Sequence, residues 1–469
     1  MCTHCPKRSI MEITEYLLDK YNVPVPRYTS YPPANHFRTT FGESDFIAMV
    51  RDSNDRRPEN IALYIHIPFC KRICYYCGCN SFSIGNGSLV EPYIEAVRKE
   101  IKLVSRHIDN RRTVSQVHFG GGTPNAVDIE YLKGIIDLLR SEFTFGREPE
   151  IAIECDPASL DLNYVDNLIA AGFNRMSFGI QDLNTEVLRG VNRRPPAMPP
   201  AELLRHIKAA DPRIGVNFDF IYGLPGQSVE SFSGTIRTAA MMKPDRLVTF
   251  SYAHVPWVKK HQAILEKKGL PAADEKTNMF LSTRRIMIEA GYEPVGLDHF
   301  VLPTDDLWQA FTSGTLHRNF QGYCTRKTTG QVYAFGVTAI SQLEEGYSQN
   351  VRNIDEYIAL TANGTLPVER GYALTGAQKL AKEVITDLMC NMRVSFSEVA
   401  SACGVSTDAV REAVRIDPDM LGGLEGDGLV SFTGDELRVT ETGAFFIRNV
   451  AAALDREYHE AVQTYSKPV

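Results

Sequence analysis

The chain has 469 residues, of which 43% are hydrophobic and 23% are charged. This composition is that of a folded globular protein, and the length allows one large domain together with a smaller one. The formal net charge of -7 disfavours a broad electrostatic grip on nucleic acid, so an RNA-modifying enzyme is a weaker hypothesis. No hydrophobic run approaches the roughly eighteen residues that a membrane-spanning helix needs, and we expect no membrane partner.

Residues 60–300 alternate short β-rich runs with longer amphipathic stretches, which is typical of repeated βα units around a parallel sheet. Six such units are too few to close an eight-stranded barrel, so they predict an α/β fold with an open, partial (β/α)6 barrel. The predicted strands span residues 62–67, 116–119, 151–154, 175–178, 215–221 and 246–252. The predicted helices span residues 91–107, 129–143, 163–171, 201–210, 229–242 and 275–290.

The pattern changes beyond residue 371, where helical stretches are followed by two short strands. The helices are predicted at 378–392, 396–402 and 407–416, and the strands are joined by residues 433–436. This order predicts a smaller, mostly helical, winged-helix-like C-terminal domain. Such domains often bind DNA, but a fold alone assigns no function, and the acidic charge favours a lid or a packing module.

Three parts of the chain are therefore expected. They are an N-terminal arm (1–54) that closes on the active site, a catalytic barrel with its extension (55–370), and the C-terminal domain (371–469). Within the arm, Cys2 and Cys5 could catch a metal ion, but chain termini are usually mobile, which disfavours a functional role.

A C-x3-C-x2-C loop formed by Cys70, Cys74 and Cys77 follows the first predicted strand. Thiolates at this spacing fit three corners of an iron-sulfur cube, and one iron is then left open to another ligand. A structural zinc site that adds Cys79 is the alternative. It is disfavoured because only Gly78 separates Cys77 from Cys79, which strains binding of both to one ion. No secretory leader begins the chain, so we expect reduced thiols and a cytoplasmic location rather than a disulfide framework.

Further unusual motifs follow the other predicted strands. They are Gly120–Pro124, Glu154–Asp156, Gly179–Gln181, Tyr222–Pro225 and Ala253–His254. In parallel barrels the site lies at the carboxyl ends of the strands, so these motifs predict one site at one mouth of the barrel.

Two of these motifs have both a functional and a structural interpretation. Gly120 to Gly122 would let backbone amides approach a ligand closely, although many such segments are only tight turns. Glu154 would be costly to bury unpaired, so it needs a partner. That partner is either a ligand with amino and hydroxyl groups or a structural salt bridge.

The cysteine loop resembles that of the radical S-adenosylmethionine (SAM) superfamily. The resemblance implies a [4Fe-4S] cluster whose open iron is chelated by the amino and carboxylate groups of SAM. Cleavage of SAM by the reduced cluster would give a 5′-deoxyadenosyl radical. It also implies a partial barrel, with the Gly120–Gly122 segment receiving the amino end of the methionine.

A narrower resemblance covers nearly the whole chain, in order. Its motifs are Pro26–Pro32, His66–Cys70, Cys77–Asn80, Asn217–Pro225, Tyr252–His254, Gly296–Phe300, His317–Tyr323 and Ile447–Asn449. Together they resemble the oxygen-independent coproporphyrinogen III oxidase family. That family converts two propionate side chains of coproporphyrinogen III to vinyl groups, giving protoporphyrinogen IX in anaerobic haem biosynthesis.

The family resemblance assigns roles to individual residues. It implies cluster ligation by Cys70, Cys74 and Cys77, and catalytic roles for Cys79, Glu154 and Gln321. The SAM on the cluster would contact Tyr64, Gly121, Glu154 and Ile340. A second SAM would contact Tyr76, Gly122, Thr123, Gln181, Arg193, Asp219 and Ala253. Tyr76 departs from the family pattern, which has phenylalanine there, and this puts that one contact in doubt.

The substrate and the partners follow from the implied chemistry. The substrate has four carboxylates, and guanidinium groups are natural anchors for them, so Arg27, Arg318 and Arg448 are candidates. Each could instead form a surface ion pair. The segment from Arg27 to Tyr31, together with Gln321, is expected to close over the substrate. A low-potential electron donor such as flavodoxin or ferredoxin and a separate electron acceptor are implied, and a monomer is expected.

Two alternatives share the barrel and the cysteine loop. One is a haem chaperone, which would use a histidine such as His254, His299 or His317 on the haem iron, although such histidines are more often structural. Chaperone relatives lack the Cys77–Asn80 end of the loop and the Pro26–Pro32 arm, and both are present here. The other alternative is a radical SAM enzyme that acts on haem itself.

Overall fold

The computed structural model describes residues 13–55, 59–325 and 331–460. Contacts along the chain divide it into two compact units. The barrel unit comprises residues 35–312 and 319–374, and the composite unit comprises the chain up to residue 34, residues 313–318 and the chain from residue 375. Each unit is described by itself. None of the described helices is both long enough and apolar enough to cross a membrane.

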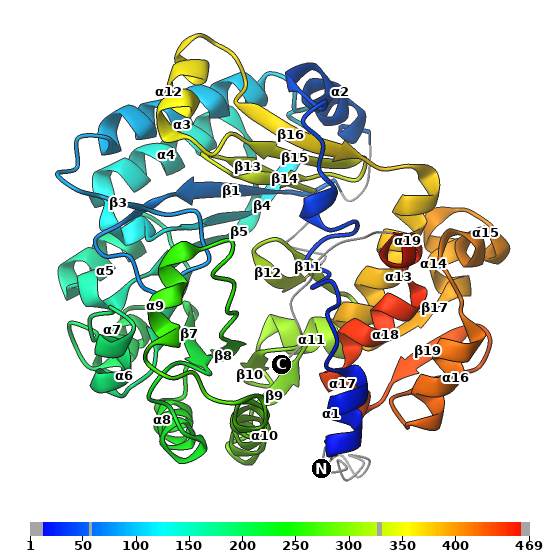
Figure 1. Ribbon diagram of the computed structural model, residues 1–469. Coiled ribbons are helices and arrows are strands. Elements are labelled where there is room, and N and C mark those ends of the chain that lie inside the picture. Colours follow the sequence, from blue (N-terminus) through cyan, green and yellow to red (C-terminus); the bar gives the residue numbers. More distant parts are fainter. Residues whose placement is uncertain (1–12, 56–58, 326–330, 461–469) are drawn as a thin grey trace. The chain divides into compact units, whose positions relative to one another are not determined.

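The barrel unit is built on one sheet of 12 strands (Figure 1). Six parallel strands lie side by side in chain order, which confirms the predicted open (β/α)6 arrangement. They are β1 (Ile61–Ile67), β4 (Thr113–Gly121), β5 (Thr144–Cys155), β6 (Arg175–Gln181), β7 (Gly215–Tyr222) and β8 (Arg246–Ser251). Among the described strands the sheet ends at β16 and β9 and does not close.

Short strands extend this sheet at both ends, and the sequence analysis did not predict them. A parallel strand and three antiparallel strands lie beyond β1, and two antiparallel strands lie beyond β8. They are β13 (Gln331–Phe335), β14 (Ile340–Gln342), β15 (Gly346–Asn350), β16 (Val368–Ala373), β10 (His299–Val301) and β9 (Glu293–Val295). Strands as short as three residues carry too little alternation of polar and apolar side chains to be recognised from the sequence.

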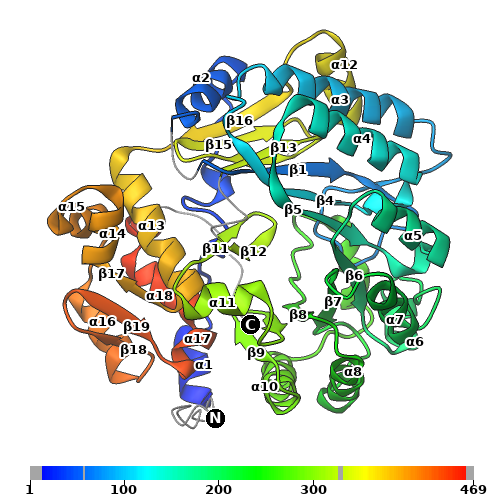
Figure 2. The same cartoon turned by 180° about the vertical axis from the view of Figure 1, so that it is seen from behind.

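Helices cover the outer side of the sheet in both views (Figures 1 and 2). Several begin at a polar residue that caps free backbone amides, as where Asp128 accepts a bond from the Glu130 amide and Asp161 from the Tyr164 amide. The predicted helices are all present, and α2, α6, α9, α11 and α12 are additional. The helices are α2 (Glu43–Ser53), α3 (Val90–Ser105), α4 (Ile129–Glu142), α5 (Leu162–Ala170), α6 (Thr185–Gly190), α7 (Pro200–Ala210), α8 (Val229–Met242), α9 (Ala263–Glu266), α10 (Ala273–Glu289), α11 (Asp306–Thr312) and α12 (Ile354–Ala362).

The central strands have one apolar face and one polar face. In β6, for example, Met176, Phe178 and Ile180 are fully buried, while the alternate residues are half-buried. The apolar face packs with the helices into the main hydrophobic core. The polar residues therefore share the other face of the sheet, and several of them belong to the predicted site.

The composite unit contains the predicted winged-helix-like elements, with one correction. Its small sheet has three strands rather than two, in the order β17-β19-β18, because β17 follows the first helix and pairs with β19. Its elements are α1 (Glu15–Tyr21), β11 (Leu316–Asn319, continuing one residue into the barrel unit), α13 (Gly376–Asn391), β17 (Arg393–Ser395), α14 (Phe396–Cys403), α15 (Thr407–Ala413), α16 (Pro418–Gly426), β18 (Val430–Phe432), β19 (Glu436–Val439), α17 (Glu441–Phe445), α18 (Ile447–Leu454) and α19 (Arg456–Glu460).

The N-terminal segment is bonded to the last helices within this composite unit. The Tyr28 hydroxyl donates to Asp455 at 2.9 Å, and Arg448 donates through Nε to the Pro26 carbonyl at 2.9 Å. The amide of Asn449 donates to the Tyr21 carbonyl. Cys2 and Cys5 lie outside the described residues. Closure of the arm over an active site remains a prediction.

Candidate active site

The cysteine loop is closed by a small pairing of strands next to β1. β2 (Phe69–Cys70) and β3 (Phe82–Ser83) run parallel, and the Ile84 amide donates to the Cys70 carbonyl at 2.9 Å. The loop between them contains Cys74 and Cys77 as well as Cys79. Because both ends of the loop are fixed, all four thiols are confined to one short segment.

The thiols have unequal acidities. Burial and the nearby thiols of Cys77 and Cys74 together raise the pKa of Cys70 to about 11, against a hydrogen bond with Thr123. A hydrogen bond with Cys79 lowers the pKa of Cys77 to about 6, and the same bond raises that of Cys79. Cys77 is therefore the member of the set that becomes a thiolate most readily.

A segment after β8 bonds to the cysteine loop from outside, and the sequence analysis missed it. The Lys259 ammonium donates to the Cys79 carbonyl at 2.7 Å. His261 Nε2 lies 2.9 Å from the Cys77 carbonyl oxygen, and the Gln262 amide donates to the Tyr76 carbonyl at 2.9 Å. No motif marks these residues, since they act on backbone groups 180 to 186 positions away.

The glycine segment at the end of β4 lies directly against the cysteine loop. A Cβ on Gly121, whose φ is +111°, would come within 2.6 Å of the His66 ring. A Cβ on Gly122 would lie 2.5 Å from the Pro68 carbonyl oxygen. Glycine is therefore required for this close approach, beyond forming a tight turn. Tyr64 is tied to the same place, since its hydroxyl lies 3.2 Å from His66 Nδ1.

Glu154 has the partner that the sequence analysis expected, and it is His118. His118 Nε2 lies 3.0 Å from Glu154 Oε1, and the Gly121 amide donates to Oε2 at 3.4 Å. Burial by itself would raise the pKa of Glu154, but the bond and charge of His118, the Gly121 amide and the nearby His66 together outweigh it, and the pKa is lowered. The side chain is still 42% exposed, so its carboxylate can also accept bonds from a ligand. His118 alternates with Gln116 and Gly120 along β4, a signal that the sequence already held.

Arg193 links the cysteine loop to two other strand ends. It donates through Nη1 to the Cys74 sulfur at 3.5 Å and through Nη2 to Asp156 at 3.2 Å, and it also bonds the Gly179 carbonyl. Burial would lower its pKa, but the nearby Tyr76, Asp156 and Cys74 raise it. The guanidinium therefore stays charged beside a candidate cluster ligand. Asp156 was part of a predicted motif, but its role as the partner of Arg193 was not predicted.

Asp219 and Gln181 bring polar groups from β6 and β7 to the same polar face. Ser177 donates to Asp219 at 2.6 Å and Asn217 donates to it at 2.8 Å. Burial raises the pKa of Asp219 to about 6 despite these bonds. Gln181 adopts φ +67°, and its Oε1, like Asn217 Oδ1, is buried without a hydrogen-bond partner among the described residues. Such unsatisfied acceptors favour a ligand with donor groups.

Other predicted site residues are less closely connected. Thr123 lies beside Cys70, and Tyr76 lies within the cysteine loop. Ala253 follows β8, Ile340 lies in β14, which β13 separates from β1, and the Gln321 amide bonds Asn319 in the turn before β12 (Gly322–Thr325). Ala253, Ile340 and Gln321 therefore come from segments outside the cysteine loop.

The residues fit the two cofactors that the superfamily uses. Among the described residues, no three Cys, His, Asp or Glu side chains already converge on one metal ion. A cube-shaped cluster bonds each thiolate to a different iron, so the three thiols of the loop need not converge on one point. The Glu154 carboxylate, which is still 42% exposed, and the free Gln181 oxygen supply hydrogen-bond acceptors beside the loop. This donor set suits a thiolate-bound cluster and an amino-bearing ligand.

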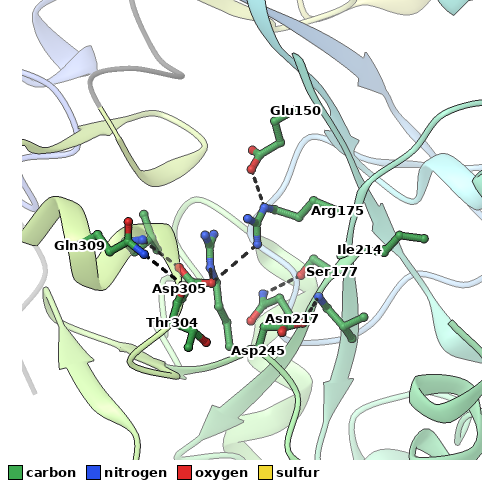
Figure 3. Close-up of polar contacts among 12 residues, drawn as sticks. Glu150, Arg175, Ser177, Ile214, Asn217, Asp245, Thr304, Asp305 and Gln309 are labelled. Carbon is green, nitrogen blue, oxygen red and sulfur yellow. Dashed lines mark hydrogen bonds and ion pairs between the residues drawn. The ribbon is translucent and has the colours of Figure 1, made fainter. Parts of the chain in front are cut away.

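An ion network occupies the other end of the same strands (Figure 3). Arg175 donates to Glu150 at 2.6 Å and lies 4.0 Å from Asp305, which also accepts a bond from Arg246 at 2.7 Å. Burial would raise the pKa of Glu150, but Arg175 and Arg246 lower it to about 2. The two arginines and the two carboxylates of this network therefore neutralise one another.

Comparisons with a family profile, with relatives of known name and with a solved structure agree with one another. A profile described as the radical SAM superfamily matches residues 64–239. An oxygen-independent coproporphyrinogen III oxidase from Synechocystis sp. is 38% identical over 446 residues, covering 95% of each chain. The protein of that name from Escherichia coli K12 is 38% identical over 444 residues, covering 94% of each chain. A solved structure of coproporphyrinogen III oxidase from Escherichia coli, described as a radical SAM enzyme, matches with a TM-score of 0.87 at 35% identity, covering 96% of this chain and 100% of that one.

Proposed function

The chain belongs to the oxygen-independent coproporphyrinogen III oxidase family of the radical SAM superfamily, and we propose that it acts on coproporphyrinogen III. It would convert two propionate side chains to vinyl groups, giving protoporphyrinogen IX in anaerobic haem synthesis in the cytoplasm. The observation that carries the proposal is the cysteine loop fixed against the Gly121 segment and Glu154. Relatives that match over nearly the full length favour this activity over haem transport and over chemistry on haem.

Cys70, Cys74 and Cys77 would hold the cluster, and Tyr64, Gly121 and Glu154 would hold SAM beside it. When bound, the cluster and SAM together supply abstraction of a hydrogen atom. The Glu154 carboxylate would accept bonds from the amino group of the methionine end or from the ribose. Ile340 would contribute an apolar contact from β14. Arg193 would hold positive charge next to the Cys74 sulfur.

A second SAM is proposed on the strand ends β6 to β8. The support is the set of buried acceptors there, Gln181 Oε1 and the carboxylate of Asp219, which suit the donor groups of an amino acid or a ribose. Gly122, Thr123 and Ala253 would complete this site, together with Arg193 and Tyr76. The added hydroxyl of Tyr76 lies on a buried ring close to Arg193, so it does not require a different pocket.

The substrate carboxylates would be held by arginines. Arg27, Arg318 and Arg448 all belong to the composite unit. Burial and the positive charges of Arg27 and Arg318 together lower the pKa of Arg448 to about 9, so the other two guanidinium groups repel that of Arg448. A propionate bound among them would relieve that repulsion. Replacing Arg27 by glutamine should raise the KM for coproporphyrinogen III more than it lowers kcat.

The overall change at each propionate balances as follows. A hydrogen atom leaves the carbon β to the carboxylate, the bond to the carboxylate carbon breaks, and CO2 departs. One electron then passes to an external acceptor, and the two side-chain carbons form the vinyl double bond. Cys79 and Gln321 are proposed to assist catalysis, and exclusion of water would be completed by the arm around Arg27 to Tyr31.

An anaerobic assay tests this proposal. Cluster-reconstituted protein is mixed with SAM, a low-potential reductant and coproporphyrinogen III, and products are separated by chromatography. Appearance of protoporphyrinogen IX together with 5′-deoxyadenosine is expected. If 5′-deoxyadenosine forms while coproporphyrinogen III is unchanged, the substrate assignment is wrong, and haem is then the next compound to test.

A further inference from the structure

A basic and aromatic surface lies on the outer side of the cysteine loop. The segment 255–268 follows β8, and its Lys259, His261 and Gln262 bond three carbonyl groups of the loop. The Lys268 ammonium lies 6.0 Å from the centre of the Tyr75 ring, so the far end of the segment contacts the loop as well. Both ends of this segment therefore lie directly against the cluster-binding loop.

Large hydrophobic side chains on this segment are exposed. Trp257 is 67% exposed and Val258 is 65% exposed, and Ile264 is 39% exposed. These three are a third of the nine exposed large hydrophobic side chains in the described chain. Exposed large hydrophobic side chains gathered at one place, an aromatic one among them, are typical of a surface that a partner covers.

The same surface is strongly positive, although the whole chain has a net charge of -7. Between residues 255 and 268 there are four lysines and a single carboxylate, Glu266, which pairs with His254 at 2.8 Å. Lys71 in the cysteine loop is exposed and adds another positive charge. The excess of positive charge is therefore a local feature of the cluster-binding end of the barrel unit.

We propose that Lys71, Trp257, Val258, Lys260, Lys267 and Lys268 form the docking surface for a small acidic electron-carrier protein. This surface is called the lysine–tryptophan patch below. The inference rests on the proposed function, because radical SAM chemistry needs one electron delivered to the cluster. The reduced carrier gives up that electron and is oxidised by one equivalent, and the cluster gains it.

The chemistry of the patch fits this partner. Complementary charge steers an acidic protein to the lysines and speeds its encounter, while the exposed Trp257 supplies an apolar anchor. The hydrogen bonds of Lys259 and His261 connect the patch to the backbone of Cys79 and Cys77. A carrier bound here would therefore stand one layer of residues from the thiolates that hold the cluster.

The test compares binding and reduction with a bacterial flavodoxin as the probe. The variants are Lys260→Glu with Lys267→Glu, and separately Trp257→Ala, all in the full-length cluster-loaded protein. The matched control is Lys99→Glu with Lys102→Glu, which reverses two exposed lysines on α3. The dissociation constant is measured by calorimetry at low and high ionic strength, and SAM cleavage is measured with flavodoxin and with titanium(III) citrate.

Charge reversal in the patch should weaken flavodoxin binding by about tenfold or more and remove most of its salt dependence. Trp257→Ala should weaken binding with its salt dependence retained. The control should bind like the parent, and all variants should cleave SAM normally with titanium(III) citrate.

Unchanged flavodoxin binding in the patch variants, or an equal loss in the α3 control, would overturn the proposal. Failure of the proposed function has a different signature. In that case flavodoxin still binds at the patch and supports SAM cleavage, but coproporphyrinogen III is not converted.

Discussion

The two ends of the parallel strands in the barrel unit use charged residues in opposite ways. At the amino ends, Glu150, Arg175, Asp305 and Arg246 are matched with one another in a buried network (Figure 3). At the carboxyl ends, the cysteine loop with the acidic Cys77 thiol lies beside a half-exposed Glu154 and unsatisfied acceptors. Charged groups that pair with one another contribute to stability. Charged and polar groups that keep free hydrogen-bonding capacity can bind ligands.

The largest effect should follow removal of one cluster ligand at the open end. Cys74→Ser deletes one of the three thiolates, so a cluster should not be retained, and product formation should fall to background. Iron content, visible absorbance and 5′-deoxyadenosine are measured together. Cys403→Ser, at an exposed cysteine on α14, is the control and should keep both iron and activity. Retained iron with full activity in Cys74→Ser would contradict the assignment.

A mutation in the ion network at the amino ends of the strands should lower the stability of the protein rather than its activity. Arg175→Met leaves Glu150 without its hydrogen-bonded cation, while Asp305 keeps Arg246, and this should cost about 3–5 kcal/mol of unfolding free energy. Urea unfolding measures this loss. Adding Glu150→Leu removes one unpaired charge and should recover part of it. If Arg175→Met instead abolished SAM cleavage in folded protein, the division between the two ends would be wrong.

Glu100 can be compared with Glu150, because it is also a buried carboxyl group. Its hydrogen-bond partners among the described residues are all neutral. The Gly336 amide, the Asn350 amide and the Tyr357 hydroxyl donate to it, yet burial raises its pKa to about 7 from the usual 4.5. With Arg175 and Arg246 nearby, Glu150 shifts the other way, to about 2. A positive charge thus decides the direction of the shift.

This difference predicts a pH dependence for the stability of the barrel unit. Since the folded pKa of Glu100 is raised, the folded state binds more protons between pH 4.5 and about 7. Its contribution is fully present below pH 4.5 and is lost as pH rises through about 7, by about 3 kcal/mol in total. Glu100→Gln should flatten this part of the urea-midpoint profile. An unchanged slope would show that Glu100 titrates normally.

A smaller effect is expected from Arg193, which lies behind the cysteine loop. Arg193→Gln removes the charge beside the Cys74 sulfur and the pair with Asp156, and such supporting contacts typically change cluster affinity or activity by about 10- to 100-fold. Iron retention under a chelator measures the effect. Arg189→Gln, on an exposed pair with Glu186, is the matched control and should behave like the parent.

The sequence predicted the parts of this site that depend on local pattern. The strand before the cysteine loop and the positions of Gly121, Glu154 and Gln181 follow from β periodicity and from the rule that parallel strands end together. The sequence analysis expected a partner for Glu154 without naming the residue. The alternation of side chains between the two faces of β4 would have identified that partner as His118. These inferences needed only neighbours in sequence or in register.

Long-range contacts could not be predicted in this way. Arg193 reaches Cys74 across 119 positions, and His261 reaches the Cys77 carbonyl across 184, without any repeated spacing that marks them. The third strand of the small C-terminal sheet was missed because β17 has only three residues between two helices. Each case depends on how separate segments of the chain pack together. The local residue pattern of a single sequence does not show this.

The central claim is tested most directly by following one hydrogen atom. Coproporphyrinogen III deuterated at the propionate carbon β to the carboxylate is incubated anaerobically with cluster-loaded protein, SAM and reductant, and 5′-deoxyadenosine is analysed by mass spectrometry. The account predicts that deuterium appears in 5′-deoxyadenosine and that one CO2 is released for each vinyl group formed. Deuterium-free 5′-deoxyadenosine, with the propionates intact, would contradict it.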